Sequence, residues 1–358
     1  MHRLNTAGYT IEVGSLLESS FAEKLIPFKD SKCFIIVDEN TQEYCLEYLL
    51  TSFEGLSEAE VVVLPMGEEN KQLEIVGHVW EVLTEYETTR HDLIINLGGG
   101  LITDMGGFIA SCYKRGIQFI NIPTTLLAMV DASIGGKTGV NLGHYKNQIG
   151  LFSTPIALYI DPIFLGTLPP EQWLSGFAEM LKHGLIHDEK LWTSVLMQME
   201  DPTTIDQDLL LACIQVKKQI VEIDPTEKNE RKKLNFGHTF GHAIEGFLME
   251  EEPITHGHAV AVGMVMEAYL SYKRGLLSQE DYQSIENALL AFYPLFTFSD
   301  DDINGVVAYL SNDKKNKSGK ILTCLLERIG GCVFDQEMTE DEAMEVFMHF
   351  KHRQINPN

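Results

Sequence analysis

Runs of apolar residues in the first half of the chain predict the strands of a parallel sheet. Short stretches rich in valine and isoleucine end in turn residues, at 33–40, 59–65, 92–100, 119–125 and 157–161. Continuous apolar runs of this length are typical of strands that are covered on both faces. Segments with helical spacing lie between them, such as QLEIVGHVWEVLTEYE. This alternation predicts a layered α/β domain.

The pattern changes after about residue 165. Long amphipathic stretches follow and indicate a mainly α-helical second half. They lie at 173–187, 207–223, 238–250, 257–275 and 279–292. One late apolar run, at 321–330, predicts a strand or a hairpin. We place the boundary between residues 161 and 168, where prolines interrupt the pattern, and expect two domains, 1–164 and 165–358.

Composition and charge narrow the class of protein. A chain of 358 residues exceeds the usual size of one core, in agreement with two domains. The formal net charge of -25 predicts that neither nucleic acid nor anionic membrane is a partner, because both bind basic patches. The 6 cysteines form no C-x-x-C pair, which favours reduced thiols in a cytoplasmic protein. We find no apolar signal segment and no stretch long enough to span a membrane.

The stretch IINLGGGLITDMGGFIAS predicts a strand, a glycine turn and a helix. Glycines let a phosphate approach the backbone, and the first turn of the helix offers N–H groups and the positive end of a dipole. The pattern G-G-G-x-x-x-D differs from the common dinucleotide fingerprint, so the motif alone fits a plain tight turn equally well. Its position at the end of a strand in an α/β domain favours a nucleotide site.

A second polar stretch, 123–150, gathers several candidate ligands around another pair of glycines. They are Thr124, Thr125, Asp131, Lys137, Lys146 and Asn147. One interpretation is a surface loop with solvated lysines. The flanking residues are apolar, however, which favours a segment held against the body of the domain. The two lysines are then candidates to bind a phosphate or a carboxylate.

Four histidines fall close together in the second half. His238 and His242 are four residues apart, so a helix would place them on one face. Thr239 stands where the metalloprotease motif H-E-x-x-H has its glutamate, which excludes that mechanism. His256 and His258 follow shortly after. Packed or surface histidines are the alternative, but the clustering favours zinc, which in catalytic sites takes three protein ligands. The residues alone do not select three of the four.

Several motifs together resemble the 3-dehydroquinate synthase family, in order from about residue 37 to 319. They are GGGLITDMGGF, YKRG, IPTTLLAMVDASIGGKTGVN, KNQIG, GFAEMLKHG, RKKLNFGHTFGHAIE and HGHAVAVGM. The resemblance implies an NAD-binding α/β domain at 1–164 and a mainly helical, metal- and substrate-binding domain at 165–358. It also implies an active site in the cleft between them and a homodimer.

The same resemblance implies roles for individual residues. Zinc, or cobalt on the same ligands, would be held by Glu179, His238 and His256, while His242 would face the substrate phosphate. The implied NAD+ contacts are Asp38, Asn40, Glu68, Lys71, Gly99, Gly100, Asp104, Thr124, Thr125, Lys137, Lys146 and Thr167. The implied catalytic and substrate residues are Arg115, Asp131, Lys137, Asn147, Lys182, Lys217, Arg231, Asn235, His242 and Lys314. Arg115 would reach the neighbouring subunit's site.

The implied reaction converts 3-deoxy-D-arabino-heptulosonate 7-phosphate to 3-dehydroquinate and phosphate, in the shikimate pathway to aromatic amino acids. It proceeds by transient oxidation with NAD+, phosphate elimination, reduction, ring opening and intramolecular aldol closure. A sister cyclase, such as 2-deoxy-scyllo-inosose synthase or an epi-valiolone synthase, is one alternative. Its substrate has no carboxylate, whereas this chain keeps Lys217, Arg231 and Asn235. A polyol dehydrogenase would release NADH, and a non-catalytic binding protein would show no turnover.

Three positions depart from the family pattern. Thr103 stands where glycine is usual, His258 where glutamate is usual, and Glu171-Gln172 where Arg-Glu is usual. If a helix begins near His256, residues two apart point about 200° away from each other. We therefore expect that His258 is not a metal ligand and that it bonds a neighbouring carboxylate instead.

Overall fold

The computed structural model describes residues 1–143, 145–201, 204–248, 254–311 and 320–355. The chain divides into two compact units, Met1–Pro169 and Pro170–Asn358. The first unit is an α/β domain and the second is mainly helical, so the predicted fold class is confirmed. Among the described residues, no helix combines the length and the apolar character needed to cross a bilayer.

The first unit is built on a seven-stranded sheet with the order β1-β2-β9-β6-β5-β3-β4. The strands are β1 (His2–Asn5), β2 (Thr10–Val13), β3 (Cys33–Asp38), β4 (Glu60–Leu64), β5 (Leu93–Gly98), β6 (Gln118–Pro123) and β9 (Ala157–Ile160). All neighbours are parallel except β1, which pairs antiparallel with β2 at the edge. The five predicted strands are therefore confirmed. The hairpin β1–β2 was not predicted, because its strands are short and partly polar.

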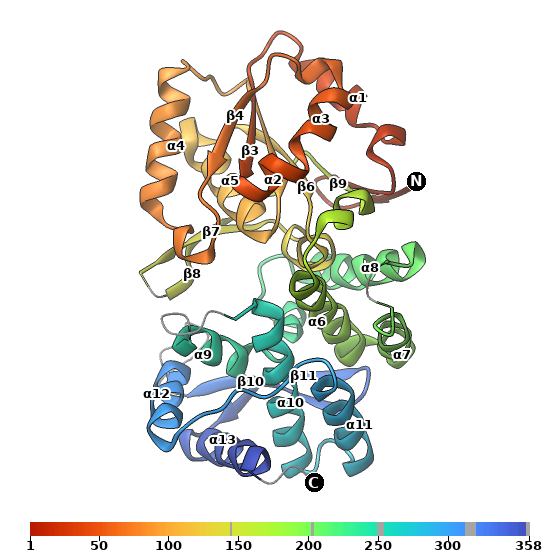
Figure 1. The fold of residues 1–358 in the computed structure, drawn as a ribbon, viewed down its shortest axis with the longest axis vertical. Helices are drawn as coiled ribbons and strands as arrows, with labels where there is room; N and C mark the ends of the chain where they lie inside the picture. Colours follow the sequence, from red (N-terminus) through yellow and green to blue (C-terminus); the bar gives the residue numbers. More distant parts are fainter. Residues whose placement is uncertain (144, 202–203, 249–253, 312–319, 356–358) are drawn as a thin grey trace. The chain divides into compact units, whose positions relative to one another are not determined.

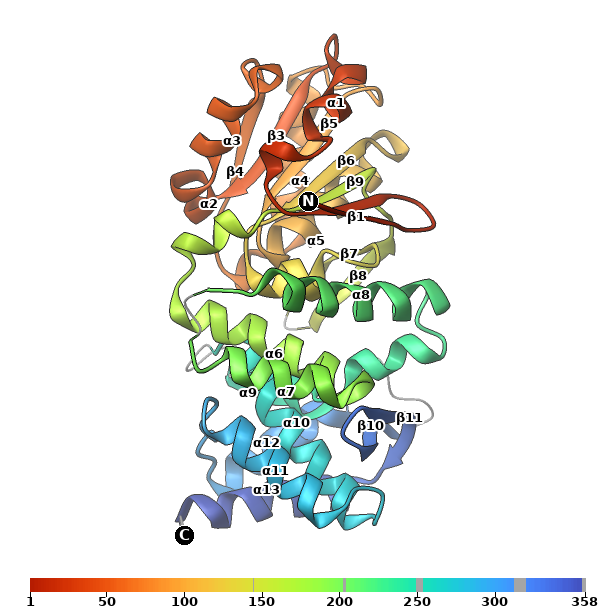
Figure 2. The ribbon, with the colours of Figure 1, turned by 90° about the vertical axis from the view of Figure 1, so that its right-hand side faces the viewer.

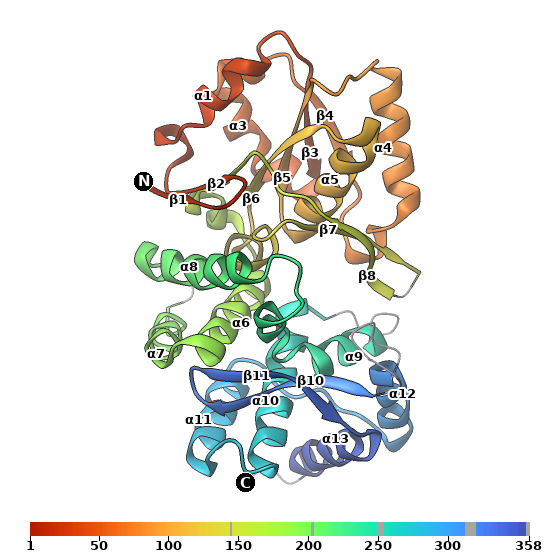
Figure 3. The same ribbon diagram turned by 180° about the vertical axis from the view of Figure 1, so that it is seen from behind.

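Helices cover the sheet on both faces. They are α1 (Phe21–Leu25), α2 (Glu39–Tyr44), α3 (Leu46–Ser52), α4 (Leu73–Glu85) and α5 (Gly100–Cys112). Figures 1 and 3 show α4 and α5 on one face of the sheet and α1 and α3 on the other. Alternate strand residues such as Phe34, Ile36 and Ile94 pack under α4 and α5 in one buried apolar cluster. The glycine turn between β5 and α5 lies at the edge of this core.

The predicted segment at 123–150 ends in an antiparallel ribbon of β7 (Lys137–Leu142) and β8 (Tyr145–Phe152). Val140 and Ile149 are paired residues of the ribbon and pack against the core beside α5. The segment is thus held against the body of its domain, as we expected. The ribbon itself was not predicted, because its glycines and polar residues mask the alternation that identifies a strand.

The second unit packs its helices around α10. The helices are α6 (Pro170–His187), α7 (Glu189–Gln198), α8 (Gln207–Ile223), α9 (His238–Leu248), α10 (His256–Lys273), α11 (Gln279–Leu290), α12 (Asp300–Ser311) and α13 (Glu340–Ile355). Figure 2 shows α10 among α6, α9 and α11, and it contacts all three. Its residues are apolar on every side, as in a helix buried all round. The predicted late hairpin is β10 (Ile321–Arg328) with β11 (Gly331–Met338).

Glycines allow α9 and α10 to approach closely. A Cβ atom at Gly263 of α10 would lie 2.0 Å from the carbonyl oxygen of Gly237, just before α9. Gly237 itself has a φ of 82°, in the left-handed region that favours glycine. The start of α9, where His238 lies, is therefore fixed against the backbone of α10.

Candidate nucleotide site and metal centre

The predicted nucleotide residues gather at the carboxyl edge of the parallel sheet. Asp38 ends β3, Gly99 and Gly100 follow β5, and Thr124 and Thr125 follow β6. These three strands are neighbours in the order β6-β5-β3. Ligands of open α/β sheets bind beyond this edge, because the loops that leave the strands meet there.

The glycine turn is joined to the turn that follows β6. The Thr124 N–H donates to the Gly98 carbonyl over 3.0 Å, and a Cβ at Gly99 would lie 3.0 Å from the Thr125 methyl group. Gly99 occupies the N-cap position of α5. A glycine there lets an anion approach the N–H groups of the first helical turn. The arrangement suits a phosphate group.

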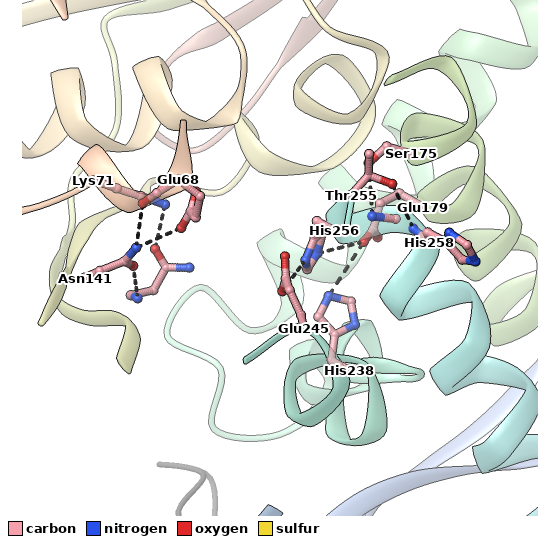
Figure 4. A network of polar contacts seen from close by, with 12 residues as sticks. Glu68, Lys71, Asn141, Ser175, Glu179, His238, Glu245, Thr255, His256 and His258 are labelled. Carbon is pink, nitrogen blue, oxygen red and sulfur yellow. Dashed lines mark hydrogen bonds and ion pairs between the residues drawn. The ribbon is translucent and has the colours of Figure 1, made fainter. Parts of the chain in front are cut away.

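Lys71 connects two further predicted residues. Its Nζ lies 2.7 Å from Asp104 Oδ2 and 2.7 Å from Asn147 Oδ1. Figure 4 shows that the neighbouring Asn141 extends this network, since its Nδ2 donates to Glu68 Oε1 over 3.0 Å. The structure thus places Asn147, a predicted substrate residue, among the predicted NAD+ residues. Sequence reasoning missed Asn141, which is buried and bonds the Asn147 N–H through its Oδ1.

Burial raises the pKa of Asp104, and the positive charges of Lys71 and Lys137 oppose that rise. The Lys71 side chain is itself only 4% exposed. The buried lysine, paired with a partly buried carboxylate, places an ammonium group near the start of α5 in a chain that is strongly acidic overall. Because the chain as a whole is strongly negative, an anionic ligand needs a local positive charge of this kind.

Asp38 and Asn40 stand at the start of α2. Asp38 Oδ1 accepts from the Thr41 N–H at 2.8 Å, and the Asp38 N–H donates to Thr41 Oγ1 at 2.9 Å, so the two residues form a capping box. Asn40 is exposed, and its Nδ2 lies 3.6 Å from Met66 Sδ. The cap holds the Asp38 carboxylate at the end of β3.

The remaining predicted residues of the first unit lie on short elements. Asp131 is in a π-helical turn, Ala128–Ala132; Lys137 begins β7; Lys146 is on β8; Thr167 ends the 3-10 segment Pro162–Thr167. Arg115 is exposed at the end of the 3-10 segment Tyr113–Arg115, which follows α5, and has a φ of 66°. Lys114 before it also has a positive φ, of 47°. Two consecutive non-glycine residues in the left-handed region are uncommon and mark a strained turn.

In the second unit, three helices bring together one carboxylate and two imidazoles. Glu179 is on α6, His238 begins α9 and His256 begins α10. Glu179 Oε1 lies 3.6 Å from His238 Nε2 and 3.5 Å from His256 Nε2 (Figure 4). Glu179 is almost fully buried and also pairs with Lys182, one turn along α6.

The other ring nitrogen of each imidazole is held by the protein. His238 Nδ1 lies 3.2 Å from the Phe236 carbonyl oxygen, and His256 Nδ1 lies 3.3 Å from Glu245 Oε2. A proton on each Nδ1 leaves the Nε2 lone pair directed toward Glu179, as in histidines that bind metals. Glu245 was not predicted. The sequence could have pointed to this residue, because Glu245 lies three residues after His242 and therefore on the same face of the helix.

Two carboxylates lie beside the His256 imidazole and change its pKa. Burial lowers the pKa of this imidazole, but the carboxylates of Glu245 and Glu179 together raise it to about 9. One carboxylate oxygen and imidazole nitrogens form a donor set that suits zinc or cobalt.

His242 also belongs to the cluster. One ring nitrogen each of His238, His242 and His256 lies within 4.8 Å of the others. The distances thus allow a three-histidine set as well as the set that includes Glu179.

His258 is separate from this cluster. Its Nε2 lies 2.7 Å from the Pro294 carbonyl oxygen, and its ring centroid lies 4.4 Å from that of Phe296. The expectation that it bonds a carboxylate was wrong, because a backbone carbonyl occupies that place. Its backbone N–H bonds the side chain of Thr255, the N-cap of α10.

Two of the predicted anion-binding residues of the second unit are buried. Lys217 on α8 is 6% exposed and Arg231 is 1% exposed. Arg231 Nη1 donates to the Pro225 carbonyl over 2.6 Å, which holds one edge of the guanidinium. Asn235 Nδ2 donates to Glu227 Oε1 over 2.6 Å. Lys314 lies outside the described residues.

Comparison with known proteins matches both units. The family model of the 3-dehydroquinate synthase N-terminal region matches residues 61–175, and that of the C-terminal region matches 176–316. A 3-dehydroquinate synthase of Parabacteroides distasonis is 40% identical over 332 residues, 92% of this chain and 94% of the relative.

Two solved structures of related cyclases share the fold. One is 2-deoxy-scyllo-inosose synthase complexed with carbaglucose-6-phosphate, NAD+ and Co2+, with 26% identity and a TM-score of 0.84 over 97% of this chain and 99% of that one. The other is 2-epi-5-epi-valiolone synthase from Streptomyces hygroscopicus with NAD+ and Zn2+ bound. It has 27% identity and a TM-score of 0.83 over 99% of each chain.

Proposed function

Because the chain belongs to the 3-dehydroquinate synthase family, we propose that its two candidate sites bind the NAD+ and the divalent metal of that reaction. The activity is that of 3-dehydroquinate synthase, a lyase that acts on a sugar phosphate in the shikimate pathway. The proposed substrate is 3-deoxy-D-arabino-heptulosonate 7-phosphate. The proposed products are 3-dehydroquinate and inorganic phosphate.

One observation supports the metal assignment above all others. Two Nε2 atoms, of His238 and His256, approach the same oxygen of Glu179, while both Nδ1 atoms are held by protein acceptors. Glu179, His238 and His256 are our proposed ligands, with zinc or cobalt as the metal. When bound, such an ion supplies a Lewis acid that polarises a hydroxyl of the substrate.

His242 is then left for the substrate. We assign it to the phosphate, since a neutral or protonated imidazole can donate to a phosphate oxygen from the edge of the cluster. Asn235 would donate to the same group. Lys217 and Arg231 would bind the carboxylate, and the bond from Arg231 to the Pro225 carbonyl would fix the orientation of the guanidinium for a two-pronged contact.

In the first unit, the start of α5 would bind the pyrophosphate of NAD+. Glu68, Lys71 and Asp104 would line the same pocket, and the pairing of Lys71 with Asp104 would hold the lysine in place. NAD+ supplies a transient hydride acceptor that is regenerated in each turnover. Asp131, Lys137, Asn147 and Lys182 remain predicted catalytic or substrate residues.

The oligomeric state of the protein and its cellular compartment are also proposals. We propose a cytoplasmic homodimer in which Arg115 reaches the site of the second subunit. The exposed, strained turn that presents Arg115 supports a role outside its own unit. Sedimentation equilibrium of the purified protein would show a dimer. An Arg115→Ala variant would then lose activity while remaining dimeric.

A decisive experiment incubates the protein with the heptulosonate phosphate, NAD+ and zinc. We expect inorganic phosphate and 3-dehydroquinate to appear together, with many phosphates per NAD+ and no lasting NADH absorbance. Stoichiometric NADH would instead identify a polyol dehydrogenase. Phosphate release from a hexose 6-phosphate without a carboxylate would identify a sister cyclase of the inosose type.

A further inference from the structure

Glu267 is a completely buried glutamate of α10 whose carboxylate lies against the start of α9. Its exposed fraction is 0%. Oε2 accepts from the Gly237 N–H over 2.8 Å, and Oε1 accepts from the Thr239 N–H over 3.1 Å. These two N–H groups belong to the residues on either side of His238. Glu267 therefore bonds the backbone on both sides of a proposed metal ligand.

The start of α9 lacks the usual local cap. The first N–H groups of a helix have no partner within the helix, and a side chain at the N-cap commonly accepts from one of them. Among the described residues, six other helices of this unit have such a residue, namely Asp188, Asp206, Thr255, Ser278, Ser299 and Thr339. Before α9 the chain has Gly237, which has no side chain. Glu267 supplies the acceptor from a different helix, where a negative charge also complements the helix dipole.

The same contact fixes the orientation of the His238 ring. The Phe236 carbonyl, which lies 3.2 Å from His238 Nδ1, is one residue before the Gly237 N–H that Glu267 holds. Gly263 is one turn before Glu267 on α10, and its backbone lies close to the Gly237 carbonyl. Glu267 and Gly263 thus hold one turn from two sides. That turn determines both the backbone of His238 and the acceptor that orients its imidazole.

We propose that Glu267 is a positioning residue for the metal centre. Its carboxylate fixes the turn at residues 236–239 so that His238 Nε2 points at the metal, and it thereby sets the metal affinity without touching the ion. This role rests on the proposed metal site. Partners of this kind, one step removed from the ligands, commonly change metal affinity by about 10- to 100-fold.

The test uses Glu267→Gln, which keeps the size of the side chain but replaces one acceptor oxygen with an N–H₂ donor. One of the two backbone N–H groups then faces a donor. We expect a folded protein whose zinc Kd, measured by competition with a chelating dye, is about 10- to 100-fold weaker. The visible absorption bands of the cobalt-loaded protein should shift, because the position of one ligand changes.

Glu286→Gln is the matched control. Glu286 is also a buried glutamate of this unit, 2% exposed, and accepts from the Tyr282 hydroxyl at 2.6 Å on α11. This change should alter stability without moving the zinc Kd or the cobalt spectrum. A similar shift in both variants would show that general loosening of the core explains the result, and it would overturn the proposal.

The outcomes separate this inference from the proposed function. If the wild-type protein binds neither zinc nor cobalt, the proposed metal site itself fails. If the wild type binds and Glu267→Gln retains its Kd and spectrum, only the positioning role fails. In a His238→Ala background, Glu267→Gln should have no further effect on residual metal affinity, and an additive loss would also overturn the proposal. Should Glu267→Gln not fold, Glu267→Asp serves in its place, since it keeps the charge but shortens the reach.

Discussion

The candidate nucleotide site in the first unit is formed largely by backbone turns, whereas the candidate metal centre in the second unit is formed by side chains. Gly99 and Thr124 contribute to the first through main-chain positions at strand ends. Glu179, His238 and His256 contribute to the second through ring and carboxylate atoms from three helices. A backbone site follows from the topology of the sheet, while a side-chain site needs each ligand to be oriented individually.

This difference predicts where each unit is sensitive to substitution. Glu245 and Glu267 are buried carboxylates that bond a proposed ligand and the backbone beside a proposed ligand, respectively. In the first unit the corresponding support is the contact of Lys71 with Asp104, beside the glycine turn. Side-chain changes should therefore have larger effects on metal binding in the second unit than on NAD+ binding in the first.

The largest expected effect compares His256→Ala with His258→Ala. The first removes a proposed ligand, so purified protein should lose most of its bound zinc and its activity. The second removes the hydrogen bond to the Pro294 carbonyl, which contributes about 1 kcal/mol to stability, and should keep zinc near full occupancy. Elemental analysis of both proteins measures this. Loss of zinc from the His258 variant alone would show that the wrong histidine was assigned.

The next effect concerns Lys71→Met. Without the Lys71 ammonium, less positive charge opposes the burial that raises the pKa of Asp104, so this pKa should rise further above its ordinary value. The folded state then binds the proton more tightly than the unfolded state does. Stability is retained at acidic pH and is lost as the pH rises through the shifted pKa. Urea unfolding should show a deficit of about 2–4 kcal/mol at pH 8 and much less at pH 4.

The double variant Lys71→Met/Asp104→Asn is the control for this pH dependence. An amide cannot ionise, so the deficit should become nearly independent of pH. NAD+ binding should weaken in both variants, as measured by calorimetry. A pH-dependent deficit that persists in the double variant would locate the titrating group elsewhere.

Much of this arrangement could be predicted from the sequence, and the exceptions have physical causes. The strands β3, β5 and β6 were predictable because continuous apolar runs dominate them. The clustered histidines were predictable because their residue type is rare and chemically specific. Glu245 and Glu267 were not, since a glutamate in a helix is usually solvated. Only tertiary packing reveals that Glu245 is buried against a proposed ligand and Glu267 against the backbone beside one. The turn at Gly237 and the bond of His258 to Pro294 likewise depend on packing between elements distant in sequence.

A third prediction tests the close approach of α9 and α10. Gly263→Ala places a Cβ 2.0 Å from the Gly237 carbonyl oxygen, so the helices must separate. We expect a loss of about 1–3 kcal/mol in stability together with weaker zinc binding. Gly77→Ala on α4 is the control, because no atom lies within 4 Å of its added Cβ. That change should stabilise the protein by about 0.5–1 kcal/mol, and equal losses in both variants would contradict the packing argument.

The smallest expected effect is at Thr103, where the resemblance to the family predicts glycine. The residue lies in the first turn of α5, is 2% exposed, and its hydroxyl donates to the Gly100 carbonyl over 3.1 Å, within its own helix. Thr103→Gly removes this bond and adds backbone entropy to the unfolded chain, so stability should fall by about 1 kcal/mol. The backbone position of the turn is held separately by the bond from the Thr124 N–H to the Gly98 carbonyl. The NAD+ Kd, measured by calorimetry, should therefore change by less than about threefold, or about 0.6 kcal/mol. A tenfold tighter Kd would instead show that the threonine side chain narrows the space for the pyrophosphate, and that side chains control this site as strongly as they control the metal centre.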